Sequence, residues 1–147
     1  MNTKIFFQKL DERAVIPQYQ TAGSAAMDLH AVLDEPVTIA PRQLVKIPTG
    51  LAMALPDENW VGLILARSGL GVKHGISPSN CVGVIDSDYR GELMVGLTNF
   101  SDTPYTIQPG DRFAQLMIVP VARCTVHELD ELPPTSRGSG GFGSTGR

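Results

Sequence analysis

The 147-residue chain contains few of the residues that mark several common protein classes. It has only two cysteines, Cys81 and Cys124, and each lies within an apolar run. Two such thiols do not form a disulfide framework, so we expect both to be buried in a protein of a reducing compartment. The three histidines are scattered and have no metal-ligand spacing with one another or with the cysteines. The sequence therefore indicates neither a disulfide-rich secreted domain nor a structural zinc site.

Long hydrophobic runs and a surplus of basic charge are also missing. The longest apolar run, residues 113–122, reaches about half a membrane span and is interrupted by Gln115 and Pro120. The N-terminal apolar run is too short for a signal peptide. Twelve basic and fifteen acidic residues give a net charge of −3, which does not favour a general nucleic-acid or membrane-binding surface. We expect a soluble, cytoplasmic protein in which any polyanionic ligand is bound by a local group of arginines.

What the sequence does have is a series of short apolar runs rich in β-branched residues, each ended by Gly, Pro, Asn or Asp. These runs predict strands, and they are KIFFQKL, VTIA, QLVKIPTGLAMAL, WVGLILA, NCVGVID, ELMVGLTNF, YTI, FAQLMIVPV and CTVHEL. The best helical candidate is the short stretch 67–75, which carries three glycines. About ten short strands at close spacing predict an all-β fold, namely a sandwich, jelly roll or barrel.

The composition changes near the C-terminus, where Pro133 and Pro134 end the last predicted strand. We therefore expect one folded domain over residues 1–132 and a flexible tail over residues 133–147. The tail ends in RGSGGFGSTGR, in which five glycines surround a single aromatic ring. So little apolar surface does not offset the entropy of ordering the chain. The tail has no lysine, which excludes a P-loop.

Two loops place a polar side chain against an apolar strand. AGSAAMDLHA (22–31) sets Asp28 at the start of a strand, which by itself favours a turn whose carboxylate accepts a nearby N–H. PGDRFAQLM (109–117) sets Gln115 inside an apolar run, where its amide needs a partner. A hydrogen-bonded core glutamine and a ligand contact are equally compatible with that position.

Two further loops carry candidate chemistry. ARSGLG (66–71) follows a strand and opens a helical turn, so Arg67 and Ser68 fit a phosphate site and fit an N-capped turn equally well. NCVGVIDSDYRGE (80–92) is typical of a tight hairpin turn. It also delivers Asp86 to a strand end as a possible general base, and Tyr89 offers a flat face for a ring ligand.

Together, the order and spacing of these segments resemble the five motifs of the dUTPase family. The motifs are AGSAAMDL, ARSGL, GVIDSDYRGE, GDRFAQL and RGSGGFGSTG, in that order over residues 22–146. The resemblance implies a β jelly roll, or distorted β-barrel, that forms a homotrimer with active sites between subunits. It implies hydrolysis of dUTP to dUMP and pyrophosphate with Mg²⁺, which keeps uracil out of DNA and supplies dUMP for thymidylate synthesis. Met27 stands where many members carry tyrosine.

The resemblance also assigns roles. Asp86 matches the base that activates water for attack on the α-phosphorus, and Asp28 matches the acidic residue near the hydrated Mg²⁺. Tyr89 matches the ring that packs on deoxyribose and excludes a 2′-hydroxyl. The remaining matches are Asn80 and Gly83 for uracil; Arg67, Ser68, Gly69 and the catalytic Gln115 for phosphate; Arg137, Ser139, Gly143, Ser144 and Thr145 for the segment that closes over phosphate; and Phe142 for the ring that covers uracil.

Two alternatives remain at this point. A dCTP deaminase, alone or combined with dUTP hydrolysis, shares the jelly roll and several motifs, but it uses a glutamate to deaminate cytosine. The aspartate-centred IDSDYRG and the complete glycine tail favour hydrolysis of dUTP instead. From another class, a jelly-roll binding module without catalysis would release no pyrophosphate from dUTP.

Overall fold

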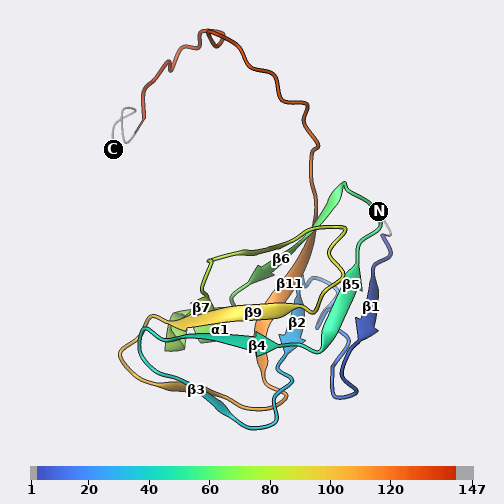
Figure 1. Ribbon diagram of the computed structural model, residues 1–147. Coiled ribbons are helices and arrows are strands. Elements are labelled where there is room, and N and C mark those ends of the chain that lie inside the picture. The colour runs from blue at the N-terminus through green and yellow to red at the C-terminus, as the bar shows by residue number, and fades with distance from the viewer. Residues whose placement is uncertain (1–2, 142–147) are drawn as a thin grey trace.

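The computed structural model describes residues 3–141 of the chain, and its body is built from strands with one short helix among those residues (Figure 1). The elements are β1 (Phe6–Lys9), β2 (Met27–His30), β3 (Val37–Ile39), β4 (Leu44–Pro48), β5 (Leu51–Ala54), β6 (Trp60–Leu65), α1 (Ser68–His74), β7 (Ile76–Pro78), β8 (Gly83–Ile85), β9 (Met94–Asn99), β10 (Tyr105–Ile107) and β11 (Arg112–Pro120). This arrangement confirms the predicted all-β fold. Among residues 3–141, no helix is long and apolar enough to cross a membrane.

The strands pair antiparallel in four sheets. The four-stranded sheet has the order β2-β11-β6-β8, and the three-stranded sheet has the order β4-β9-β7. Two-stranded ladders join β1 to β5 and β10 to β3. The strands bury Leu29, Ile47, Leu97, Phe113 and Leu116 between these layers, each with 1% exposure or less. The core therefore fixes β11 between β2 and β6, and this placement positions the candidate site.

Three local expectations differ from the structure. Both Cys81 and Cys124 are exposed, so the expectation of two buried thiols is wrong. CTVHEL (124–129) forms no strand in this chain, because residues 122–139 are exposed and leave the body in a long arc (Figure 1). The short strand β7 was not among the predicted strands. The last strand ends at Pro120, and a domain boundary near residue 132 stays a prediction.

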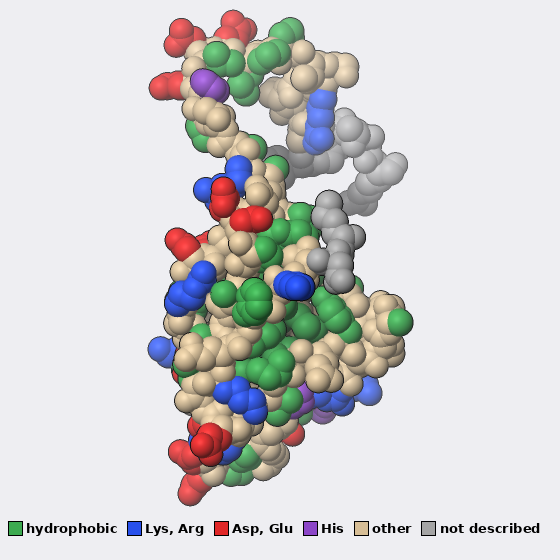
Figure 2. Space-filling view, turned by 90° about the vertical axis from the view of Figure 1, so that its right-hand side faces the viewer, with side chains coloured by type: hydrophobic (Ala, Val, Ile, Leu, Met, Phe, Trp, Pro, Cys, Tyr) green, Lys and Arg blue, Asp and Glu red, His purple; other side chains and the backbone are tan. Residues whose placement is uncertain are grey.

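An apolar cleft of about 710 Å³ opens beside β1. Its apolar lining comprises Ile5, Phe7, Ile16, Pro17, Tyr19, Met27, Trp60 and Ile118. Figure 2 shows hydrophobic side chains gathered on this side of the body, below the arc of the C-terminal segment. None of the described candidate site residues lines the cleft. The polar chemistry therefore lies elsewhere on the molecule.

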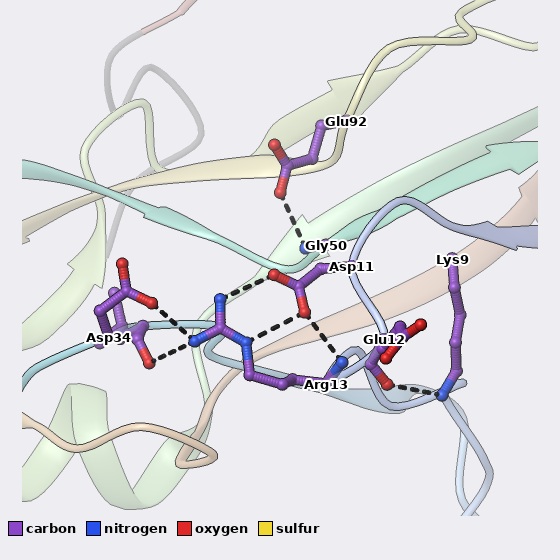
Figure 3. Close-up of polar contacts among 8 residues, drawn as sticks. Lys9, Asp11, Glu12, Arg13, Asp34, Gly50 and Glu92 are labelled. Carbon is purple, nitrogen blue, oxygen red and sulfur yellow. Dashed lines mark hydrogen bonds and ion pairs between the residues drawn. The ribbon is translucent and has the colours of Figure 1, made fainter.

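The segment after β1 is held by a solvent-facing ion-pair group, shown in Figure 3. The Arg13 guanidinium donates to both carboxylate oxygens of Asp11, at 3.0 and 2.7 Å, and to Asp34 at 2.7 Å. The hydrogen bonds from the Arg13 side chain and backbone lower the pKa of Asp11 from 3.8 to about 2. The ionised Asp11 is thus favoured in the folded state.

We expect Asp11→Asn to lower the thermal midpoint by a few degrees near neutral pH, because exposed ion pairs contribute little stability. The folded-state pKa lies below the ordinary value, so this contribution is complete above about pH 4 and disappears as the pH falls towards about 2. Thermal melts of both proteins at several pH values would show the difference narrowing on acidification. A difference that stays constant between about pH 7 and pH 3 would contradict the assignment.

Candidate functional site

A buried carboxylate organises the first group of site residues. Asp28, on β2, is 4% exposed. It accepts hydrogen bonds from Arg67 Nε at 3.0 Å, Arg112 Nη1 at 3.1 Å and Gln115 Nε2 at 3.3 Å. Burying an ionised carboxylate is costly unless it is paired and hydrogen-bonded, and two guanidinium groups meet that requirement here. The expected local turn around Asp28 is therefore wrong, because its partners come from two distant segments.

Sheet register explains why these residues meet. On β11, Gln115 pairs with Asp28 of β2 on one side and with Leu65 of β6 on the other. Arg67 lies two residues after the end of β6, and its Nη1 donates to the Arg112 carbonyl oxygen at 2.8 Å. A register shift between Arg112 and Ala114 interrupts the ladder at that point. Residues 28, 67, 112 and 115 thus lie together although they are far apart in sequence.

The group lines a hollow of about 430 Å³, together with residues 20, 24–26, 65–66 and 117. Two guanidinium groups and one carboxylate leave one positive charge in excess. Each guanidinium has five N–H donors, and the contacts above use only part of them. Arg112 is 46% exposed, so it retains access to solvent and ligand. The hollow is therefore suited to oxygen atoms of a bound phosphate.

The start of α1 borders this hollow. Arg67 occupies the N-cap position, and no side chain there makes a capping hydrogen bond. Ser68 and Gly69 begin the helix and are exposed. The N-capped-turn interpretation of Ser68 is therefore wrong, because the hydroxyl lies inside the first turn and does not cap it. Ser68 and Gly69 are next to Arg67 in the chain.

His30 lies on the same face of β2 as Asp28, two residues further along the strand. Its Nδ1 is buried and has no hydrogen-bond partner among the described residues. Burial lowers the pKa of His30, and the guanidinium groups of Arg112 and Arg67 lower it further against an opposing effect of Asp28. The imidazole is thus favoured in its neutral form, which leaves the excess charge of the group on the arginines.

A second group is built on the turn after β8. The Tyr89 amide donates to the Asp86 carbonyl oxygen at 3.2 Å, which closes the turn. Arg90 Nη1 donates to the carbonyl oxygens of Ser87 and Tyr89, at 2.8 and 2.9 Å. Asp86 and Tyr89 share a small hollow of about 180 Å³ with Glu92. Both are exposed, so a ligand can reach the carboxylate and the ring.

The two groups lie at opposite ends of one strand pair. In the β6–β8 ladder, Gly62 pairs with Ile85 and Ile64 pairs with Gly83. Asp86 therefore lies near the start of β6, whereas Arg67 follows its end. Among the described residues, no hollow contains members of both groups. A single chain does not bring Asp86 to the arginine group.

The residues predicted to read uracil lie at the other end of β8 from Asp86. Gly83 begins β8, and Asn80 lies in the preceding exposed turn. Cys81 in this turn has a φ of 64°, a left-handed conformation that is uncommon for a residue with a side chain. The backbone of this turn is thus bent sharply between Asn80 and Gly83.

Only part of the predicted closing segment falls among the described residues. Arg137 Nε donates to the Gly140 carbonyl oxygen at 2.7 Å, and Ser139 is exposed. Both lie in the arc that stands away from the body in Figure 1. Phe142, Gly143, Ser144 and Thr145 lie outside the described residues. The roles of all six tail residues stay predictions.

Sequence reasoning missed one member of the arginine group. The motifs assigned no role to Arg112, yet it is one of the two arginines that form an ion pair with Asp28. Its position in GDRFAQL, three residues before Gln115, was the available signal. The bend between Arg112 and Ala114, which no local pattern reveals, accompanies this contact.

Comparison with known proteins gives a consistent result. The family model described as dUTPase matches residues 12–146. The chain is 48% identical to the deoxyuridine 5′-triphosphate nucleotidohydrolase of Acinetobacter baylyi, covering all of this chain and 98% of that protein. It is 50% identical to the protein of that name in Idiomarina loihiensis, covering all of this chain and 97% of that protein.

Solved structures agree with the sequence relatives. A mutant dUTPase of Staphylococcus bacteriophage 80alpha, described with dUpNHpp, matches with a TM-score of 0.88 and 26% identity, covering all of both chains. A mutant dUTPase from phage phi11 of S. aureus, described with a structural Mg(II) ion, matches with a TM-score of 0.77 and 27% identity. That match covers 87% of this chain and 97% of the phage chain.

Proposed function

The chain belongs to the dUTPase family and hydrolyses dUTP to dUMP and pyrophosphate, and we propose that the two groups described above divide this reaction between them. The arginine group around Asp28 binds the triphosphate, and the turn carrying Asp86 and Tyr89 supplies the base and the sugar contact. Neither dCTP deamination nor a non-catalytic binding role is favoured by these relatives.

The observation that carries the proposal is the pairing of both Arg67 and Arg112 with one buried carboxylate. Asp28 holds the two guanidinium groups in place before substrate arrives, so less entropy is lost when they bind phosphate. Gln115 shares the same carboxylate oxygen as Arg67, which orients its amide into the hollow. Ser68 and Gly69, at the start of α1, add a hydroxyl and backbone N–H groups that bind phosphate oxygens.

Asp86 is suited to act as general base because it is exposed at the end of a rigid strand pair and lies in the same hollow as Tyr89. A positioned base typically contributes about 10²–10⁴ to the rate. The remaining acceleration comes from orientation of the triphosphate and from stabilisation of its charge. The Tyr89 ring packs on deoxyribose, and the turn with Asn80 and Gly83 contacts uracil.

The residues present fit Mg²⁺ as the cofactor. Among residues 3–141 there is no cluster of three or more carboxylate, histidine or cysteine ligands. Mg²⁺ usually keeps several waters and binds through substrate phosphates and one or two carboxylates, so it requires no such cluster. Asp28 is the carboxylate placed to contact the ion through water. When bound, the ion neutralises charge on the phosphates.

We further propose a homotrimer with active sites between subunits, working in the cytoplasm, where the substrate is made and used. The separation of Asp86 from Arg67 along β6 supports this assembly, because a site that uses both needs a second copy of the chain. The distribution of charge is consistent with this proposal, because a chain with a net charge of −3 places Arg67 and Arg112 together in one hollow.

Mixed assemblies of two inactive variants test the shared site. Asp86→Asn and Arg67→Ala each inactivate the enzyme alone. When they are co-expressed in equal amounts with different tags and purified through both tags, every trimer is mixed, and about a third of the sites receive an intact Asp86 and an intact Arg67. We expect dUTP hydrolysis well above that of either parent.

The matched control combines Asp86→Asn with Tyr89→Ala. These residues lie on one turn of one chain, so every mixed site keeps a defect and activity stays at the level of the parents. Recovery in the control, or no recovery in the first mixture, would contradict a site shared between subunits. A pyrophosphate-release assay across the deoxynucleoside triphosphates, with and without Mg²⁺, tests the activity and the cofactor. Release of ammonia from dCTP would contradict the assignment of the chain as a dUTP hydrolase.

A further inference from the structure

Glu92 follows the catalytic turn and has no role among the assigned site residues. It lies in the same small hollow as Asp86 and Tyr89 and is partly buried. We propose that Glu92 is a positioning residue, whose carboxylate anchors the backbone beneath Tyr89 and thereby sets selectivity for deoxyribose over ribose. This inference rests on the proposed packing of Tyr89 against the sugar.

The carboxylate is tied to the turn between β4 and β5. Its Oε1 accepts a hydrogen bond from the Gly50 backbone N–H at 2.8 Å, and Figure 3 shows the side chain pointing at that nitrogen. The next residue is tied to the same turn twice. The Leu93 N–H donates to the carbonyl oxygen of Leu51 at 2.7 Å. The buried Thr49 hydroxyl donates to the Leu93 carbonyl oxygen at 2.8 Å.

The turn between β4 and β5 is held in place by close packing and by a backbone hydrogen bond. Gly50 has a φ of 63°, a conformation suited to glycine. A Cβ there would lie 3.0 Å from the Cβ atoms of Ala14 and Asp11, so the backbone is packed closely against the segment after β1. The Gly50 carbonyl accepts from Leu10 N–H at 2.7 Å. The Arg13 pair in Figure 3 holds Asp11 in the same segment.

The other side of Glu92 holds the tyrosine. Tyr89 Oη donates to the Glu92 carbonyl oxygen at 3.1 Å. The ring also packs so closely on Gly91 that a Cβ at that position would overlap it. Because the ring touches the backbone of residues 91 and 92, the position of that backbone determines where the ring lies.

Loss of the carboxylate would leave the partly buried Gly50 N–H without its acceptor and free the backbone under the ring. A displaced ring distinguishes less well between a sugar with and without a 2′-hydroxyl. Selectivity is a difference between two substrates, so it reports ring position separately from overall activity. We expect Glu92→Ala to lower the ratio of kcat/KM for dUTP to that for UTP by about tenfold.

The experiment measures that ratio for purified, full-length Glu92→Ala, Glu92→Gln, Tyr89→Phe and Tyr89→Ala. Glutamine keeps an Oε1 acceptor for Gly50, so its ratio stays within about twofold of the parent. Tyr89→Phe keeps the ring but loses the bond to Glu92, and its ratio also falls. The exposed Glu35→Ala serves as a matched control and keeps both activity and ratio. Thermal midpoints of all variants are recorded.

The outcomes separate this inference from the role proposed for Tyr89. If Tyr89→Ala leaves the ratio unchanged, the sugar-packing role fails. If Tyr89→Ala lowers the ratio while Glu92→Ala lowers kcat/KM for both nucleotides equally, Glu92 is only structural and the inference is overturned. If Glu92→Ala does not fold, Tyr89→Phe decides: an unchanged ratio overturns the inference, and a lowered ratio supports it.

Discussion

The Asp86→Asn variant is expected to lose most of its turnover, with kcat falling by about 10²–10⁴-fold. Asparagine has nearly the same shape as aspartate but does not accept a proton from water at neutral pH. The turn itself is held by the Tyr89 amide and by Arg90, which act on backbone oxygens and do not involve the Asp86 carboxylate. The substitution therefore leaves the fold and the arginine group around Asp28 in place.

Single-turnover hydrolysis and binding of a non-hydrolysable dUTP analogue measure the two effects separately. The dissociation constant is expected to change by less than about threefold, because nucleotide affinity comes from the arginine group. Asp88→Asn is a matched control, since Asp88 lies two residues away on the same turn and is exposed. Full activity of Asp86→Asn, or an equal loss in Asp88→Asn, would contradict the assignment of the base.

The strands that the sequence predicted well are those whose apolar residues face one core. In β11, the run FAQLMIVPV is apolar apart from Gln115, and the strand ends at Pro120, so its position could be predicted from local pattern alone. The strand β7 is only three residues long and ends in Pro78, which removes most of that pattern. CTVHEL has the composition of a strand, but pairing needs a partner strand, and residues 124–129 have none in the part of the chain that the structure describes.

Candidate site residues could be proposed from motif resemblance, but the contacts among them could not. The contacts of Asp28 with Arg67, Arg112 and Gln115 depend on β11 lying between β2 and β6, and this strand order is a property of the whole sheet. Local reasoning offered a turn for Asp28 and left Gln115 undecided between core and ligand. The observed bond gives the Gln115 amide a partner and Asp28 a donor from a distant strand, and the ligand role of Gln115 stays a prediction. The separation of Asp86 from Arg67 follows from the β6–β8 register, which no motif contains.

Deletion of residues 137–147 is expected to leave a folded protein with very little activity. Residues 122–139 are exposed and leave the body, and none of the deleted residues that the structure describes, 137–141, belongs to the core (Figure 1). The deletion removes Arg137 and the aromatic ring of Phe142. Without a segment to close over the nucleotide, bulk water keeps access to the triphosphate and weakens charge stabilisation there. We expect a loss in kcat/KM of about 10²-fold or more.

Phe142→Ala is the graded comparison for the deletion. Stacking of an aromatic ring on a base contributes about 1–3 kcal/mol, so this variant should lose less activity than the truncated chain. Thermal melts and gel filtration establish that both proteins keep the fold and the assembly of the parent. If the truncated chain is fully active, the prediction that the tail closes over the nucleotide is wrong. Equal losses in the two variants would instead assign the whole effect to the ring, and the glycines and Arg137 would then have no part in closing over phosphate.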